Sequence, residues 1–138
     1  MPTVTVSTPI PAGVSEDKVI AVLHNHDAII KAICPQLISY QLESGDPHGT
    51  AVYQVTDKKP IGQTTWKLTI TNHSDGVDTL VNAKPPVGTL VISCKWRVAN
   101  GQLKEDADID ANMLLKKMVR GSFEKDRPGQ HSKLLAQA

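Results

Sequence analysis

The sequence predicts an α+β fold in which a curved antiparallel sheet of about seven strands wraps around one long C-terminal helix. Three observations predict it. The first is a β-branched strand pattern followed by two short helical patterns. The second is a succession of six strand-like segments, and the third is the return of the helical period after residue 111. With 138 residues, 40% of them hydrophobic, the chain is expected to form one domain over residues 1–138.

The first strand and the two short helices each carry local signals. Residues 3–7 alternate in β-branched side chains, and Ser15 is a good N-cap for the helix that follows. Asp27 is a candidate cap for the second helix, which has to end before Pro35 because proline disfavours helical backbone in the residue ahead of it. The apolar positions of the two helices are Val19, Ile20, Val22, Leu23, Ile29, Ile30 and Ile33.

From residue 37 the chain has strand periodicity until the last helix. The six predicted strands are residues 37–42, 50–56, 64–71, 77–83, 89–98 and 103–111. Residues that favour turns separate them at 44–47, 57–60, 72–76, 85–86 and 100–101. Gly121 and Pro128 are expected to bend or interrupt the last helix. The apolar positions of this helix are Met113, Leu114, Met118 and Val119.

The strongest local inference concerns the hairpin at Asn100 and Gly101. This pair favours a two-residue type I′ turn, which needs positive φ at both positions. The turn sets Trp96 opposite Glu105 on a face that is otherwise apolar. The other pairs on that face are Val98–Leu103, Cys94–Ala107 and Ile92–Ile109, and those on the charged face are Lys95–Asp106 and Ser93–Asp108. Asp106, Asp108 and Asp110 form a row of carboxylates on the charged face. We interpret this row as solvated rather than as a metal site.

Glu105 is the charged residue on the apolar face of this hairpin. A carboxyl group in that position is desolvated, and enzymes use desolvated carboxyl groups as general acids or bases. The alternative is that Glu105 is hydrated at the mouth of a cavity or paired with a lysine or arginine. Glu105 is therefore the first catalytic candidate, with a structural role as the alternative.

Tyr40 and Tyr53 are further catalytic candidates. Each shares a strand face with apolar neighbours, so both rings are expected to point inward, where each hydroxyl needs a hydrogen-bond partner. A ligand carbonyl is one candidate partner and a backbone carbonyl is the other. The residues predicted to line a ligand site are Trp66, Trp96, Cys94, Leu90, Ile92, Leu114 and Met118.

Composition argues against several classes of function. Fifteen basic and fourteen acidic side chains give a net charge of +1, which provides no field for nucleic acid, and two tryptophans, two tyrosines and one phenylalanine are too few for base stacking. No apolar run approaches the about 18 residues of a membrane span, and the N-terminus lacks a signal-peptide pattern, so we expect a cytoplasmic protein. The two isolated cysteines are expected to be reduced. Without a metal, nucleotide or flavin motif, we expect no cofactor.

The order of the elements resembles the helix-grip fold of the START, birch-pollen-allergen and polyketide-cyclase superfamily, often called SRPBCC. This resemblance covers the whole chain. Residues 19–34, 57–62 and 83–88 are also similar to a group of small fungal proteins of this type without a settled activity. The superfamily has no invariant catalytic motif, so the resemblance implies a ligand cavity but no particular site residue.

The resemblance to polyketide-cyclase-like proteins implies that the partner is a hydrophobic or polycyclic small molecule. The expected activity is a cofactor-free cyclisation or isomerisation in secondary metabolism, either a pericyclic step of the Diels–Alder type or a proton transfer. Such a pocket accelerates a reaction by holding a flexible substrate in its reactive shape, helped by hydrogen bonds from a tyrosine or a protonated Glu105. Two alternatives stay open: a non-catalytic lipid or sterol carrier of the START kind, and a module that binds a protein on the outer face of the sheet.

Overall fold

The computed structural model describes residues 2–59, 62–85 and 88–138. Parts of the predicted turns at 57–60 and 85–86, namely residues 60 and 86, lie outside the described residues. The helices are α1 (Glu16–His24), α2 (His26–Ile33) and α3 (Met113–Leu135). The strands are β1 (Val4–Pro9), β2 (Leu37–Gly45), β3 (Thr50–Lys58), β4 (Gln63–His73), β5 (Gly76–Ala83), β6 (Leu90–Ala99) and β7 (Gln102–Asp110).

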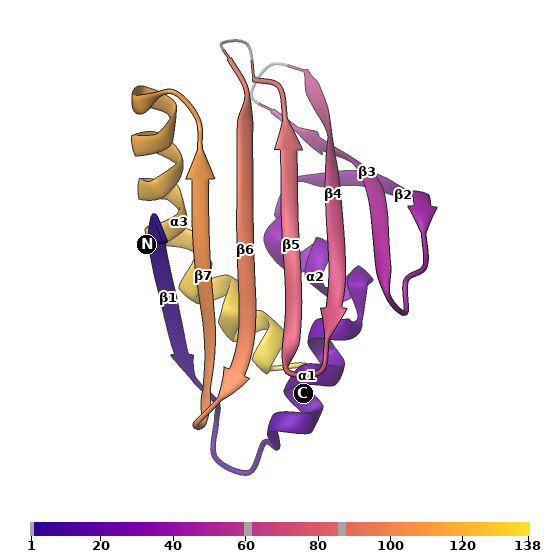
Figure 1. The fold of residues 1–138 in the computed structure, drawn as a ribbon, viewed down its shortest axis with the longest axis vertical. Coiled ribbons are helices and arrows are strands. Elements are labelled where there is room, and N and C mark those ends of the chain that lie inside the picture. The colour runs from indigo at the N-terminus through magenta and orange to yellow at the C-terminus, as the bar shows by residue number, and fades with distance from the viewer. Residues whose placement is uncertain (1, 60–61, 86–87) are drawn as a thin grey trace.

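The seven strands form an antiparallel sheet in the order β1-β7-β6-β5-β4-β3-β2. All three helices lie against the same face of this sheet, which we call the concave face (Figure 1). The predicted fold class is therefore confirmed: two short helices follow the first strand, and a long C-terminal helix packs on the sheet. The edge strand β2 carries two register shifts against β3, between Leu37 and Ser39 and between Leu42 and Ser44.

The helix starts follow from their capping residues, with one difference from the prediction. Ser15 caps α1 as expected, and its hydroxyl accepts a hydrogen bond from the Lys18 amide. The cap of α2 is Asn25, whose side chain accepts from the Ala28 amide, and not Asp27. Because α1 ends at His24 and α2 begins at His26, Asn25 terminates one helix and caps the next.

The hairpin between β6 and β7 has the predicted turn and register. Asn100 and Gly101 both have positive φ, 54° and 72°, as a type I′ turn requires. Trp96 lies opposite Glu105, and every other pair predicted for this hairpin is also found. The sequence-based assignment of faces therefore holds along both strands.

Helix α3 continues through Gly121 and Pro128 and is not interrupted by either residue. Its first part lies beside β1 and β7, and its last part crosses behind the sheet (Figure 1). Leu114 and Met118 are exposed, although the sequence suggested that they belong to the apolar face. The helix is rotated so that the residues facing the sheet include Val119 but not Met113, Leu114 or Met118. The residues that face the sheet are the half-buried Leu115 and Val119 and the buried Phe123, His131, Leu134 and Leu135.

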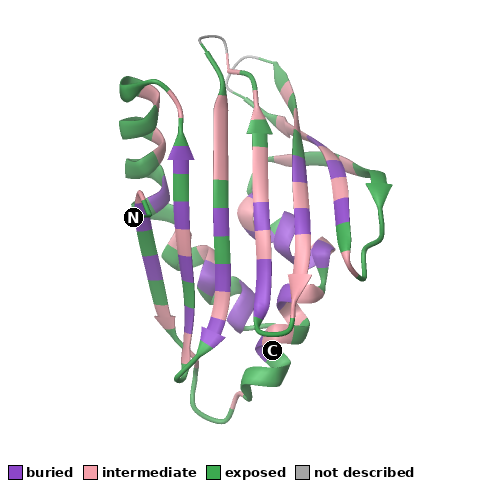
Figure 2. Ribbon diagram, in the orientation of Figure 1, coloured by how far each residue is buried: buried purple, intermediate pink, exposed green. Residues whose placement is uncertain are grey.

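Burial is concentrated where the last part of α3 and the two short helices cover the sheet (Figure 2). Both cysteines, Cys34 and Cys94, are free and buried, as predicted. In the described part of the chain, no helix has the length and apolarity needed to cross a membrane.

Candidate functional site

Glu105 lies on β7, next to the edge strand β1, and is fully buried. It lies on β7 between Val6 of β1 and Trp96 of β6, and all three side chains are on the concave face. Strand alternation forces this position, because Leu103 and Ala107 on either side of Glu105 are buried on the same face. A carboxyl group is rarely buried to this degree without a partner.

The first partner of Glu105 is His131 of α3. The Nε2–H of His131 donates to Oε1 of Glu105 at 2.8 Å, and neither side chain has any exposed surface. The other ring nitrogen, Nδ1, lies 2.9 Å from the hydroxyl of Thr8 on β1. In a neutral imidazole Nδ1 accepts this hydroxyl proton, so the histidine is satisfied on both sides.

The second partner of Glu105 is Arg127, one helical turn before His131. Its Nε lies 3.6 Å from Oε1 of Glu105, which makes an ion pair but is too long for a hydrogen bond. The guanidinium carbon lies 5.3 Å from the ring centroid of Trp96 and 4.2 Å from that of Phe123. Only 12% of the Arg127 side chain is exposed. Two aromatic rings and one carboxylate therefore hold this cation below the surface.

Three polar atoms of this group have no hydrogen-bond partner among the described residues. They are Oε2 of Glu105 and both Nε and Nη1 of Arg127, and all three atoms are buried. Buried polar atoms are nearly always paired in folded proteins, so unpaired ones require an explanation. We call the four residues Glu105, Arg127, His131 and Trp96 the Glu105 cluster. One acceptor and two donors of this cluster are therefore unpaired among the described residues.

Trp96, a member of the cluster, and Cys94, its neighbour on the same face of β6, are both buried. The indole N–H of Trp96 donates to the Thr79 hydroxyl at 3.1 Å, so the ring has a protein partner and a fixed orientation. Burial raises the pKa of the Cys94 thiol, and the negative charge of Glu105 adds to this effect. The thiol is therefore protonated and unsuited to act as a nucleophile.

The two tyrosines belong to a different group from Glu105. Tyr53 is buried on β3, and Nδ1 of His26 on α2 lies 2.7 Å from its hydroxyl, while Nε2 of His26 lies 2.8 Å from Oδ1 of Asn72. Tyr40 on β2 is half-buried and donates to the carboxylate of Asp27. Both hydroxyls thus bind side chains and not a backbone carbonyl.

The surroundings of the tyrosines hold their protons in place. Burial, followed by the hydrogen bond to Asp27, raises the pKa of Tyr40 to about 12. Burial also raises the pKa of Tyr53 and lowers that of His26. Because β4, β5 and β6 lie between β3 and β7, the structure does not bring these residues together with Glu105.

An apolar wall lies on the concave face beyond the Glu105 cluster. Trp66, Leu90 and Ile92, all predicted to line a ligand site, are half-buried and pack against the core, together with Val81. Figure 2 shows this intermediate burial along β4, β5 and β6. Leu114 and Met118 point away from this wall into solvent. The wall is therefore built by the sheet, and Val119 of α3 packs against the buried core.

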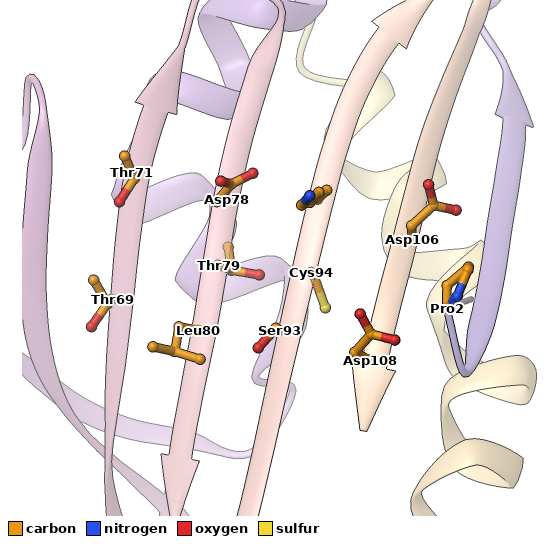
Figure 3. A pocket seen from close by; sticks show the side chains of 11 residues that line it. Pro2, Thr69, Thr71, Asp78, Thr79, Leu80, Ser93, Cys94, Asp106 and Asp108 are labelled. Atoms are coloured by element: carbon orange, nitrogen blue, oxygen red, sulfur yellow. The ribbon is translucent and has the colours of Figure 1, made fainter. Parts of the chain in front are cut away.

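A measurable hollow lies on the outer face of the sheet, with a volume of about 470 Å³. Figure 3 shows the side chains of β4 to β7 that surround it, among them Thr71, Asp78, Asp106 and Asp108. Most of them alternate with the residues of the concave face. The hollow is open, polar and apolar side chains both line it, and the sheet separates it from Glu105.

Comparison with known proteins places the chain in a family. The family model described as "Domain of unknown function (DUF7053)" matches residues 2–138. The chain belongs to this family. No curated protein matches this DUF7053 chain.

Solved structures resemble the DUF7053 chain in fold. It is similar to Ara h 8.0201, with 13% identity, a TM-score of 0.66 and coverage of 96% of this chain and 95% of that one. It is similar to TTHA0849 from Thermus thermophilus, with 9% identity, a TM-score of 0.60 and coverage of 97% and 94%. The third is the Zhui aromatase/cyclase from Streptomyces sp. R1128, with 14% identity, a TM-score of 0.62 and coverage of 97% and 90%. At these identities the likeness shows the helix-grip fold alone.

Sequence reasoning identified Glu105 in this DUF7053 chain but missed Arg127 and His131. These two residues lie on α3 beyond Gly121, where the apolar pattern of the helix had become weak. A signal was present nonetheless. Phe123, Arg127 and His131 follow one another at intervals of four residues, which places them on one face of a helix.

Proposed function

We propose that the protein binds a hydrophobic or polycyclic small molecule between the concave face and α3, and catalyses its cofactor-free cyclisation or isomerisation. One observation carries the proposal: Glu105 and Arg127 present buried polar atoms without a partner among the described residues, next to a half-buried apolar wall. A pocket that is mostly apolar with a few fixed polar groups is the usual form of a small-molecule site. The helix-grip fold is consistent with this use.

The apolar wall and Arg127 bind different parts of the ligand. The apolar body of the ligand packs against Trp66, Leu90 and Ile92, which gain contacts that the protein alone does not give them. An oxygen of the ligand accepts a hydrogen bond from Nη1 of Arg127. The ligand reaches this position between the sheet and the first part of α3, where the helix is anchored less deeply than at Phe123.

An isomerisation would use the same atoms. Oε2 of Glu105 takes a proton from a carbon next to a ligand carbonyl, and the electron pair moves onto the carbonyl oxygen. The guanidinium of Arg127 stabilises the enolate that forms. Return of the proton to another carbon of the same system completes the reaction and regenerates Glu105. In a pericyclic cyclisation no proton moves, and Arg127 lowers the barrier by hydrogen bonding to a carbonyl of the substrate.

A carrier of the START kind is the second candidate function, and one observation favours it. The charge of Glu105 is already balanced by Arg127, and its Oε1 is already bound by His131. A carrier needs no more than a stable polar end to its pocket. The two functions differ in whether Glu105 exchanges a proton with the bound molecule.

Binding is tested with an anilinonaphthalene sulfonate dye, whose apolar rings and anionic group suit the wall and Arg127. We expect a micromolar dissociation constant. Arg127→Leu should weaken binding about tenfold or more, because a charge-assisted hydrogen bond is lost. Arg120→Leu is the matched control, since Arg120 is an exposed arginine on the same helix. Absence of dye binding, or equal losses in the two variants, would contradict the proposal.

Catalysis is tested separately with a steroid β,γ-unsaturated ketone, whose conversion to the conjugated ketone is followed by ultraviolet absorbance. For an isomerase, Glu105→Gln should lower turnover about 10²–10⁴-fold while the dye still binds. No conversion by the wild-type protein, combined with tight binding of the steroid, would favour the carrier.

A further inference from the structure

The first part of α3 exposes apolar side chains on the side that faces away from the sheet. Met113 is 89% exposed, Leu114 73% and Met118 62%. Figure 2 shows that this part of the helix is largely exposed. Leu115 and Val119 already provide the face that packs on the protein. A surface helix normally carries polar residues opposite its packed face, so these three apolar residues need another reason.

Basic residues lie among these apolar side chains. Lys116, Lys117 and Arg120 are exposed, and residues 113–123 contain no acidic residue. The next acidic residue, Glu124, forms an ion pair with Arg120 at 2.8 Å. The positive charges of Lys116 and Lys117 are not balanced in this way. The nearest preceding acidic residue, Asp110, ends β7. We call Met113, Leu114, Lys116, Lys117 and Met118 the outer patch.

We infer that the outer patch docks the protein on an anionic lipid bilayer. Leu114 and Met118 are four residues apart and lie one above the other, so both side chains can enter the bilayer together. Lys116 and Lys117 then reach the negatively charged headgroups with their flexible stems. Exposed apolar residues combined with cations on one helix are the features by which interfacial helices bind membranes.

The charge and size of the patch argue against a second copy of the chain as its occupant. In a symmetric dimer the patch would face itself, so Lys116 and Lys117 would meet their own copies. Specific protein interfaces also involve roughly 20–30 residues on each side, whereas the outer patch has five members. A bilayer needs no matching surface.

This inference goes beyond the proposed function and does not depend on it. The same turns of α3 present the outer patch on one side and pack Val119 against the core on the other. A protein docked through the outer patch would therefore hold α3, and the face of the sheet that it covers, close to the lipid surface. An apolar ligand could then move between bilayer and protein with little exposure to water.

The test is co-sedimentation with vesicles of phosphatidylcholine alone and of phosphatidylcholine mixed with phosphatidylserine, at low and high salt. We expect binding to the mixed vesicles only, and weaker binding at high salt. The double variants Leu114→Ser with Met118→Ser, and Lys116→Glu with Lys117→Glu, should each reduce the bound fraction about tenfold or more. Their melting temperatures should stay unchanged because all four side chains are exposed.

Two matched controls use exposed residues away from the outer patch. Ile38→Ser removes an apolar side chain that is 52% exposed on β2, and Lys133→Glu reverses a charge at the far end of α3. Neither should change vesicle binding. Equal binding to both kinds of vesicle, equal losses in the controls, or a concentration-dependent dimer that both outer-patch variants abolish would overturn the inference. Dye binding measured on the same variants shows whether the ligand site is still intact.

Discussion

Glu105 and His131, both without exposed surface, join the sheet to the last part of α3 by a hydrogen bond of 2.8 Å. Thr8 extends the connection to β1 at the edge of the sheet. One imidazole ring therefore links β7 and α3 to β1, which lies at the other end of the sequence. Hydrogen bonds to buried charged groups stabilise more than exposed ones, because no water replaces the lost partner. The same residues that form the candidate site thus also hold the fold together.

Replacing Glu105 by glutamine should consequently lower stability as well as any activity. Glu105→Gln keeps the shape but removes the negative charge next to Arg127, which stays buried. We expect a loss of about 3–5 kcal/mol in the free energy of unfolding, the range seen when one member of a buried ion pair is removed. Urea unfolding measures it.

The control for this variant is Glu124→Gln, which removes a carboxylate from an exposed ion pair on α3. Its effect should be below about 0.5 kcal/mol. If the two variants unfold at the same urea concentration, the ion pair of Glu105 with Arg127 does not stabilise the protein.

Acid should destabilise the protein through His26. Burial lowers the pKa of His26 below its ordinary value of 6.5, because the charged ring is desolvated. The unfolded chain then takes up the proton more readily than the folded protein, so the contribution of His26 is complete above pH 6.5 and is lost as the pH falls towards the lowered pKa. We expect the melting temperature to fall less steeply over this range in His26→Gln. His48→Gln removes an exposed histidine whose charge is the smallest contribution to the lowered pKa of His26, so its curve should stay close to that of the wild type. Parallel curves for all three proteins would contradict the prediction.

Neither thiol should react in the folded protein. Burial raises the pKa of Cys34 to about 12, and it raises that of Cys94 as well, so the thiolate that attacks a disulfide reagent is scarce. Titration with Ellman's reagent should give no rapid reaction in native buffer and two equivalents in guanidinium chloride. A fast-reacting thiol in native buffer would show that one of the two sites opens to solvent.

Gly76 should tolerate no side chain. A Cβ atom at this position would lie 1.8 Å from the carbonyl oxygen of Trp96 on the neighbouring strand. We expect Gly76→Ala to cost about 3 kcal/mol, at the upper end of the range for overpacking. Gly121→Ala is the control, since no atom lies within 4 Å of its added Cβ, and it should stabilise α3 by about 1 kcal/mol. Equal melting temperatures for Gly76→Ala and Gly121→Ala would mean that β5 and β6 can move apart at Gly76.

The hairpin could be predicted from the sequence because its geometry is local. The Asn100–Gly101 turn sets the register within two residues, and every pair along β6 and β7 follows from it. The burial of Glu105 was therefore accessible from the sequence. The identity of its partners was not, because His131 is 26 residues away on a helix whose rotation depends on tertiary packing.

The apolar residues of α3 explain why that rotation could not be predicted. Apolar side chains occur at 113, 114, 115, 118 and 119, on all sides of the first turns. Several rotations would therefore bury similar areas. The rotation found is the one that also brings Arg127 and His131 to Glu105, and it leaves Leu114 and Met118 outside.

The pairing of β1 with β7 determines when the chain can complete its fold during synthesis. Val4 of β1 lies opposite Ala107, so the first strand has no partner until more than a hundred residues have been made. Contacts between such distant segments form slowly, because a long loop must close before they contribute. Helix α3, which carries Arg127 and His131, leaves the ribosome later still. Until then the part of the concave face that α3 covers stays exposed, and nascent chains are prone to aggregate through it.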